Sequence, residues 1–140
     1  MATTASITIT SDIYPAFGGI SKTMTLTQAG TTTDIDSTTG FSRRKLSATG
    51  NVDLITMANE LVEPGDNTAA KVYIKNMGYK GEWDKSTYVT VTINAQEVGR
   101  LYGGDWLLMP VTVVDGEDIV VNPSTDDTVV LEYTMFYEEA

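Results

Sequence analysis

Residues 86–94, STYVTVTIN, decide the fold class because apolar and hydroxyl side chains alternate strictly along them. Val89 and Val91 fall on one side of an extended chain, and Thr90 and Thr92 fall on the other. Successive side chains of a β-strand point to opposite faces of its sheet, so the alternation predicts a half-buried strand. Thr suits the solvent face of such a strand, since β-branched residues favour extended backbone.

The same two-residue period predicts four more strands. They are SITIT at 6–10 with Ile7 and Ile9 inward, TMTLT at 23–27 with Met24 and Leu26 inward, AKVYIKN at 70–76 with Val72 and Ile74 inward, and VVLEYTMFY at 129–137 with its odd-numbered residues inward. Weaker strands are predicted at 44–48, 53–59, 105–110, 111–114 and 119–122, between clusters of Gly, Pro, Asn and Asp typical of turns.

About eight or nine short strands in 140 residues predict an all-β, single-domain β-sandwich, with a jelly-roll-like topology. Residues 1–19 are expected to form an N-terminal arm, because Pro15 and the pair Gly18–Gly19 interrupt the strand pattern, and residues 20–140 to form the sandwich. Helical turns compete with strands at 37–46 and 94–102, where Asn94 and Glu97 have the spacing of a capping box.

The amino-acid composition argues against several classes of function. Nineteen acidic and nine basic residues give a net charge of −10, which argues against a protein that binds DNA or RNA through its phosphates. The chain has no Cys and no His, so thiolate chemistry and the commonest general base and zinc ligand are missing. We therefore expect a protein that is not an enzyme and has no cofactor. The N-terminus has no signal-peptide pattern, so export is not predicted. The sequence has no run of about 20 apolar residues, so a membrane span is not predicted.

Two acidic patterns partly match known kinds of functional site. Asp34, Asp36 and Thr38 match the first, third and fifth positions of a calcium loop, but Lys45 stands where that loop needs a bidentate Glu. The acidic residues at 115–118 and 126–127 could pair as a general acid and base, yet Gly and Pro beside them favour solvated turns. Neither pattern is predicted to bind a metal or to catalyse a reaction.

The remaining candidate residues are predicted to contact a partner protein. Residues 95–110, AQEVGRLYGGDWLLMP, lack the ending of a P-loop, so Gly103–Gly104 is predicted to be a tight turn between strands. Beside it, Tyr102 and Trp106 are either core residues or contact anchors. The full set of candidate interface residues is Ile7, Ile9, Tyr14, Phe17, Arg43, Arg44, Lys45, Trp83, Arg100, Tyr102 and Trp106.

Three segments, NTAAKVYIKNMG at 67–78, YVTVTINAQEVGRLYGGDWLLMP at 88–110 and VVLEYTMFYEE at 129–139, resemble a pattern found in small virion structural proteins of tailed bacteriophages. The resemblance implies a non-enzymatic capsid decoration or cement protein on the capsid surface, made in the host cytoplasm. It also implies the major capsid protein as a partner and a homo-oligomer, such as a trimer.

Two alternatives stay open. One is a tail, baseplate or fibre component of the same particle. The other is a carbohydrate-binding module in which Trp83, Tyr102 and Trp106 stack on sugar rings.

Overall fold

The computed structural model describes residues 2–11, 13, 19–28, 30–35, 37–57, 69–78, 87–114, 116–126 and 128–138. Those residues form eleven β-strands and no helix, so they include no helix able to cross a membrane. The strands are β1 (Thr4–Ile9), β2 (Ile20–Thr25), β3 (Ser37–Thr38), β4 (Ser42–Leu46), β5 (Val52–Ile55), β6 (Ala69–Asn76), β7 (Tyr88–Ile93), β8 (Gln96–Tyr102), β9 (Trp106–Thr112), β10 (Ile119–Pro123) and β11 (Val129–Tyr137).

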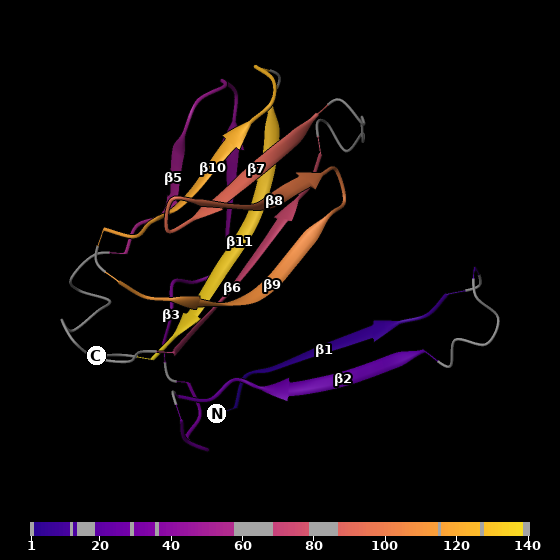
Figure 1. Ribbon diagram of the computed structural model, residues 1–140, viewed down its shortest axis with the longest axis vertical. Coiled ribbons are helices and arrows are strands. Elements are labelled where there is room, and N and C mark those ends of the chain that lie inside the picture. The colour runs from indigo at the N-terminus through magenta and orange to yellow at the C-terminus, as the bar shows by residue number, and fades with distance from the viewer. Residues whose placement is uncertain are drawn as a thin grey trace.

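The strands from β3 onward build a β-sandwich, as predicted (Figure 1). The four-stranded sheet has the order β5-β10-β7-β8. The five-stranded sheet has the order β3-β11-β6-β9, and β4 pairs with β11 beside β3. The pairing is nested along the chain, since β7 pairs with β8, β6 with β9, β5 with β10 and β4 with β11, all antiparallel.

The core lies between these two sheets and follows the predicted alternation. The inward residues of β11 include Val129, Leu131 and Met135, all fully buried. Val72 and Ile74 of β6 and Val89 and Val91 of β7 are fully buried as well. The period-two pattern therefore identified the buried face of β6 and β7 correctly. In β11, Tyr133 and Tyr137 are only partly buried, and Thr134, predicted to point outward, is buried.

The inward orientation predicted for Ile7, Ile9 and Met24 is wrong. These side chains are 37%, 48% and 43% exposed, because β1 and β2 pair only with each other and form a separate two-stranded hairpin. Alternation shows which side chains share a face, but it does not show whether another layer covers that face. Figure 1 shows the hairpin reaching away from the sandwich.

Three local predictions also change. Residues 37–46 contain β3 and β4, and residues 96–102 form β8, so the helical turns considered there are absent. Asn94 and Ala95, with φ of 51° and 57°, form the turn between β7 and β8 instead of starting a helix. The two strands predicted at 105–110 and 111–114 are one strand, β9, which tolerates Pro110 because it is an edge strand.

Candidate interaction surface

The hairpin has two chemically different faces. In its register Ala5 lies opposite Met24, Ile7 opposite Lys22 and Ile9 opposite Ile20, so one face is apolar apart from Lys22. The other face carries only hydroxyl side chains, namely Thr4, Ser6, Thr8, Ser21, Thr23 and Thr25. Ser6 and Thr23 are hydrogen-bonded across it, with 2.9 Å between their oxygens. The hairpin is thus amphipathic, although neither face is covered.

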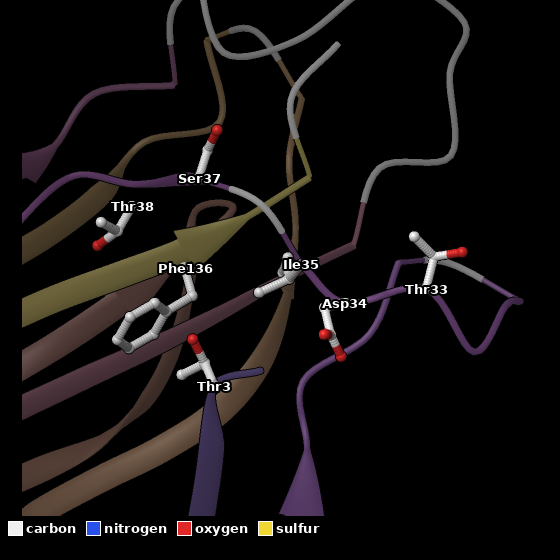
Figure 2. Close-up of a pocket in the computed structure, with 7 residues that line it drawn as sticks. All are labelled: Thr3, Thr33, Asp34, Ile35, Ser37, Thr38 and Phe136. Carbon is white, nitrogen blue, oxygen red and sulfur yellow. The ribbon is translucent and has the colours of Figure 1, made fainter. Parts of the chain in front are cut away.

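The root of the hairpin is held by main-chain hydrogen bonds to the segment that follows β2. The Leu26 N–H donates to the Thr3 carbonyl at 2.9 Å, the Ile35 N–H donates to the Leu26 carbonyl at 3.0 Å, and both Leu26 and Ile35 are buried. Beside this anchor lies a hollow of about 540 Å³. Figure 2 shows its lining, which is Thr3, Thr33, Asp34, Ile35, Ser37, Thr38 and Phe136. Among the described residues of that lining, Asp34 is the single charged one.

A second hollow, of about 220 Å³, separates the apolar face of the hairpin from the edge of the five-stranded sheet. The hairpin contributes Ala5, Ile7, Lys22 and Met24, and the sheet contributes Lys71, Leu108, Met109 and Pro110. The hairpin and the sheet therefore border one continuous region of the surface.

The outer face of the five-stranded sheet carries aromatic and basic side chains. The strand register sets Lys75 beside both Trp106 and Glu132, and Glu132 beside Arg43. Lys71, Tyr73 and Lys45 lie on the same side of the sheet, because every second residue of β6 and β4 points outward. We call Arg43, Lys45, Lys71, Tyr73, Lys75 and Trp106 the aromatic-cationic face.

Aromatic rings run across this face. The ring centroids of Tyr73 and Trp106 are 6.4 Å apart, and Phe41, which is 62% exposed, lies nearly parallel to Tyr73 at the same centroid distance. These spacings fall within the range of favourable aromatic contacts. Trp106 itself is 49% exposed, so the sandwich does not use it as a core residue.

Glu132 joins two members of the face. Its Oε2 accepts from Arg43 Nε at 3.1 Å and lies 3.0 Å from Arg43 Nη2, while its Oε1 accepts from the Tyr73 hydroxyl at 3.1 Å. Burial, followed by the hydrogen bond to Glu132 and the charge of Glu132, raises the pKa of Tyr73 above its ordinary value. Tyr73 therefore stays protonated as a donor, and Glu132 is already engaged by two side chains.

The basic cluster predicted at 43–45 is divided between two locations. Arg43 and Lys45 belong to the aromatic-cationic face. Arg44 points to the other side of β4, where its Nη1 donates to the Asp53 carbonyl of β5 at 2.9 Å. Arg44 thus bridges the two sheets.

Arg100 and Tyr102 lie on the four-stranded sheet, apart from Trp106. Arg100 is 4.5 Å above the ring of Tyr88, whose centroid is 5.4 Å from that of Tyr102. The turn at Gly103–Gly104, predicted as a strand connection, passes the chain from β8 in one sheet to β9 in the other. Within the described part of the chain, Tyr102 and Trp106 therefore belong to two separate clusters of aromatic rings. Tyr14, Phe17 and Trp83 lie outside the described residues.

Sequence reasoning missed Phe41, Lys71, Tyr73 and Lys75 as surface candidates. Their alternation in AKVYIKN already set Lys71, Tyr73 and Lys75 opposite the core. What the sequence could not supply was the register of β6 against β9 and β11, which brings Tyr73 to Trp106 and Glu132.

Within the described residues, no three Asp or Glu side chains gather in a way that could hold a metal ion. Asp118 is structural there, since its carboxylate accepts from the Met57 N–H at 2.7 Å. Asp36, Asp115 and Asp127 lie outside the described residues. A scan against known protein-family models gave no match, and a search of curated proteins gave none either.

Proposed function

We propose that the chain is a non-enzymatic structural protein of a tailed-bacteriophage virion, and specifically a capsid decoration or cement protein that bridges neighbouring capsomers. The observation that carries this proposal is the amphipathic hairpin, which extends from the sandwich (Figure 1) and has an exposed apolar face. A two-stranded hairpin by itself is only marginally stable in water. We therefore expect this hairpin to become more stable when its exposed apolar face packs against another protein.

The strand order gives further support. If the strands from β4 to β11 are counted as one to eight, strands one, eight, three and six form one sheet and strands two, seven, four and five form the other. This nested order supports the jelly-roll-like topology expected from the sequence, a fold used by viral capsid proteins and by lectins. Fold alone does not decide between such functions. The hairpin favours assembly, whereas Tyr102 and Trp106, two of the three aromatic residues proposed for sugar binding, belong to separate clusters.

Attachment through the hairpin can be tested on phage particles that lack this chain. We expect that adding the purified protein will raise the temperature, or the severity of osmotic shock, at which the particles release their DNA. Ile9→Asn combined with Ile20→Asn should abolish this effect, because the cross-strand pair Ile9 and Ile20 forms the distal part of the apolar face. Many copies on a symmetric shell would turn a weak contact into durable attachment.

The matched control is Thr8→Asn combined with Ser21→Asn, a neighbouring cross-strand pair on the hydroxyl face. This variant should protect the particles as well as the unaltered protein does. DNA release that is indifferent to added protein would disprove the cement role. Antibody labelling at a single vertex would assign the chain to the tail, baseplate or fibre instead.

A further inference from the structure

The hollow of about 220 Å³ between the hairpin and the five-stranded sheet lies at the edge of β9. Leu108, Met109 and Pro110 all line it, and successive residues of a strand point to opposite faces of its sheet. A hollow lined by all three therefore follows the strand edge and not one face of the sheet. Because β9 is the last strand in the order of its sheet, no described strand pairs with that edge.

Both sides of the hollow offer apolar side chains to solvent. The hairpin supplies Ile7 and Met24 from its apolar face, and both side chains are exposed. On the side of β9, Leu108 and Met109 are only partly buried, and Pro110 is exposed. Apolar side chains of a partner that filled the hollow would remove this surface from water, which is the main source of favourable free energy in protein association.

Two lysines, Lys22 of the hairpin and Lys71 of β6, also line the hollow. Neither forms an ion pair with any of the described residues, and the described part of the lining includes no carboxylate. A partner that covers the hollow displaces water from these ammonium groups, which costs free energy unless the partner supplies hydrogen-bond acceptors. Carboxylates are the strongest acceptors for a charged donor. The lining therefore favours a partner that is both apolar and acidic.

We propose that this hollow binds an extended segment of a partner protein, in which an apolar side chain is flanked by Asp or Glu. The apolar side chain would fill the space between Ile7 and Leu108. The flanking carboxylates would stay at the rim, where the long stems of Lys22 and Lys71 let their ammonium groups reach them. Pro110 has no N–H to donate to an added strand, so side chains contribute more to this recognition than main-chain pairing with β9 does.

A small organic ligand fits the hollow less well than a protein segment does. Sites for such ligands usually measure about 300 to 1,000 Å³ and enclose most of the ligand. At about 220 Å³ the hollow is smaller than these sites, and it matches a few side chains of a longer chain that continues past it.

The inference rests on the proposed function, because it names the kind of segment that the hairpin would meet on a neighbouring protein. It concerns another part of the hairpin, however. The hollow is lined by Ile7, Lys22 and Met24, whereas the attachment test above changes the distal pair Ile9 and Ile20. The two proposals can therefore fail separately.

Selection from a displayed library of random linear peptides on the immobilised full-length protein tests the inference. We expect the selected peptides to share an apolar residue flanked by Asp or Glu. Synthetic copies should bind the Lys71→Glu variant about tenfold more weakly than the unaltered protein, because a favourable charge contact becomes a repulsive one. Lys45→Glu is the matched control. It makes the same change of charge on β4, away from the described lining of the hollow, so it should weaken binding by less than about threefold.

Two further comparisons separate the apolar and the charged contributions. Ile7→Asn should weaken peptide binding by about tenfold, whereas Thr8→Asn, the next residue on the hydroxyl face, should leave binding unchanged. Peptides in which Lys replaces each Asp or Glu should bind the Lys22→Glu, Lys71→Glu double variant more tightly than they bind the unaltered protein. A merely structural role of the two lysines would not give this reversal.

A library that yields no binder, selected peptides without an acidic residue, or equal losses with Lys71→Glu and Lys45→Glu would each overturn the inference. Binding of octanoate that is lost with Ile7→Asn, with no peptide selected, would overturn it as well and assign the hollow to a small amphiphile. If the inference fails and particles are still protected, the cement role stands. If peptides bind as expected and particles are not protected, the cement role alone is refuted.

Discussion

Asn76 is a fully buried polar residue at the place where β6 meets the corner between β8 and β9. Its Nδ2 donates to the Leu101 carbonyl at 2.8 Å, and its Oδ1 accepts from the Gly78 N–H at 2.8 Å. Its main chain also bonds with the turn, accepting from the Gly104 N–H at 2.8 Å. One amide side chain thus satisfies two main-chain groups that have no access to water.

We predict that Asn76→Ala lowers the free energy of unfolding by about 2 to 4 kcal/mol, because it leaves a buried carbonyl and a buried N–H unpaired. Urea unfolding followed by circular dichroism would measure the change. Asn122→Ala is the control, since Asn122 bonds to Gly50 and Asn51 near the solvent, and it should cost less than about 1 kcal/mol. Equal losses in the two variants would contradict the role assigned to Asn76.

At the scale of elements, the turn between β7 and β8 carries a strained residue. Asn94 and Ala95 both have positive φ, the geometry of a type I′ hairpin turn, in which Asn-Gly is the favoured pair. Ala95 carries a Cβ in a left-handed conformation that costs roughly 1 to 2 kcal/mol. We predict that Ala95→Gly raises the free energy of unfolding by about 0.5 to 1 kcal/mol, once the greater flexibility of Gly in the unfolded chain is subtracted.

Chemical denaturation would measure this gain as a shift of the midpoint at constant slope. Gly104→Ala provides the converse, because Gly104 has a φ of 92° in the turn that leads from β8 to β9. That change should lower stability. A loss of stability in Ala95→Gly would show that this turn does not keep its left-handed geometry in solution.

The strands also show which parts of the fold could be predicted from the sequence. The central strands β6 and β7 were predictable with their inward residues, because a buried face imposes a strict two-residue period. The period holds only in part along β11, where Thr134 is buried. The covering of β1 and β2 was not predictable, since Ile7 and Ile9 have the same period whether or not another layer lies over them. Two strands were predicted at 105–110 and 111–114, whereas β9 continues through Pro110, because an edge strand has a free side on which a missing N–H costs nothing.

The candidate surface was only partly predictable, for a related reason. Trp106 and Arg43 could be named as surface candidates from their sequence neighbours. Their companions Tyr73 and Lys75 come from a strand far away in the chain, and cross-strand register alone joins them. Register depends on the packing of the whole sandwich, so a local pattern does not encode it.

At the scale of the whole molecule, the hairpin and the sandwich should differ in stability. The hydrophobic core contains no residue of β1 or β2, and Leu26 and Ile35, which are buried at the root of the hairpin, are not part of that core either. Local opening of such a segment costs far less free energy than global unfolding. We therefore predict that, in hydrogen exchange of the free protein, the amides of β1 and β2 exchange quickly, whereas those of β6, β7 and β11 are protected.

The same experiment, repeated on protein bound to particles, connects this difference to function. If the apolar face of the hairpin docks on a neighbour, β1 and β2 should gain protection on binding, while the central strands, already protected, should change little. The Ile9→Asn, Ile20→Asn variant should show no such gain. Protection of β1 and β2 equal to that of the core in the free monomer would mean that the hairpin is stable by itself, and the need for a partner to cover its apolar face would disappear.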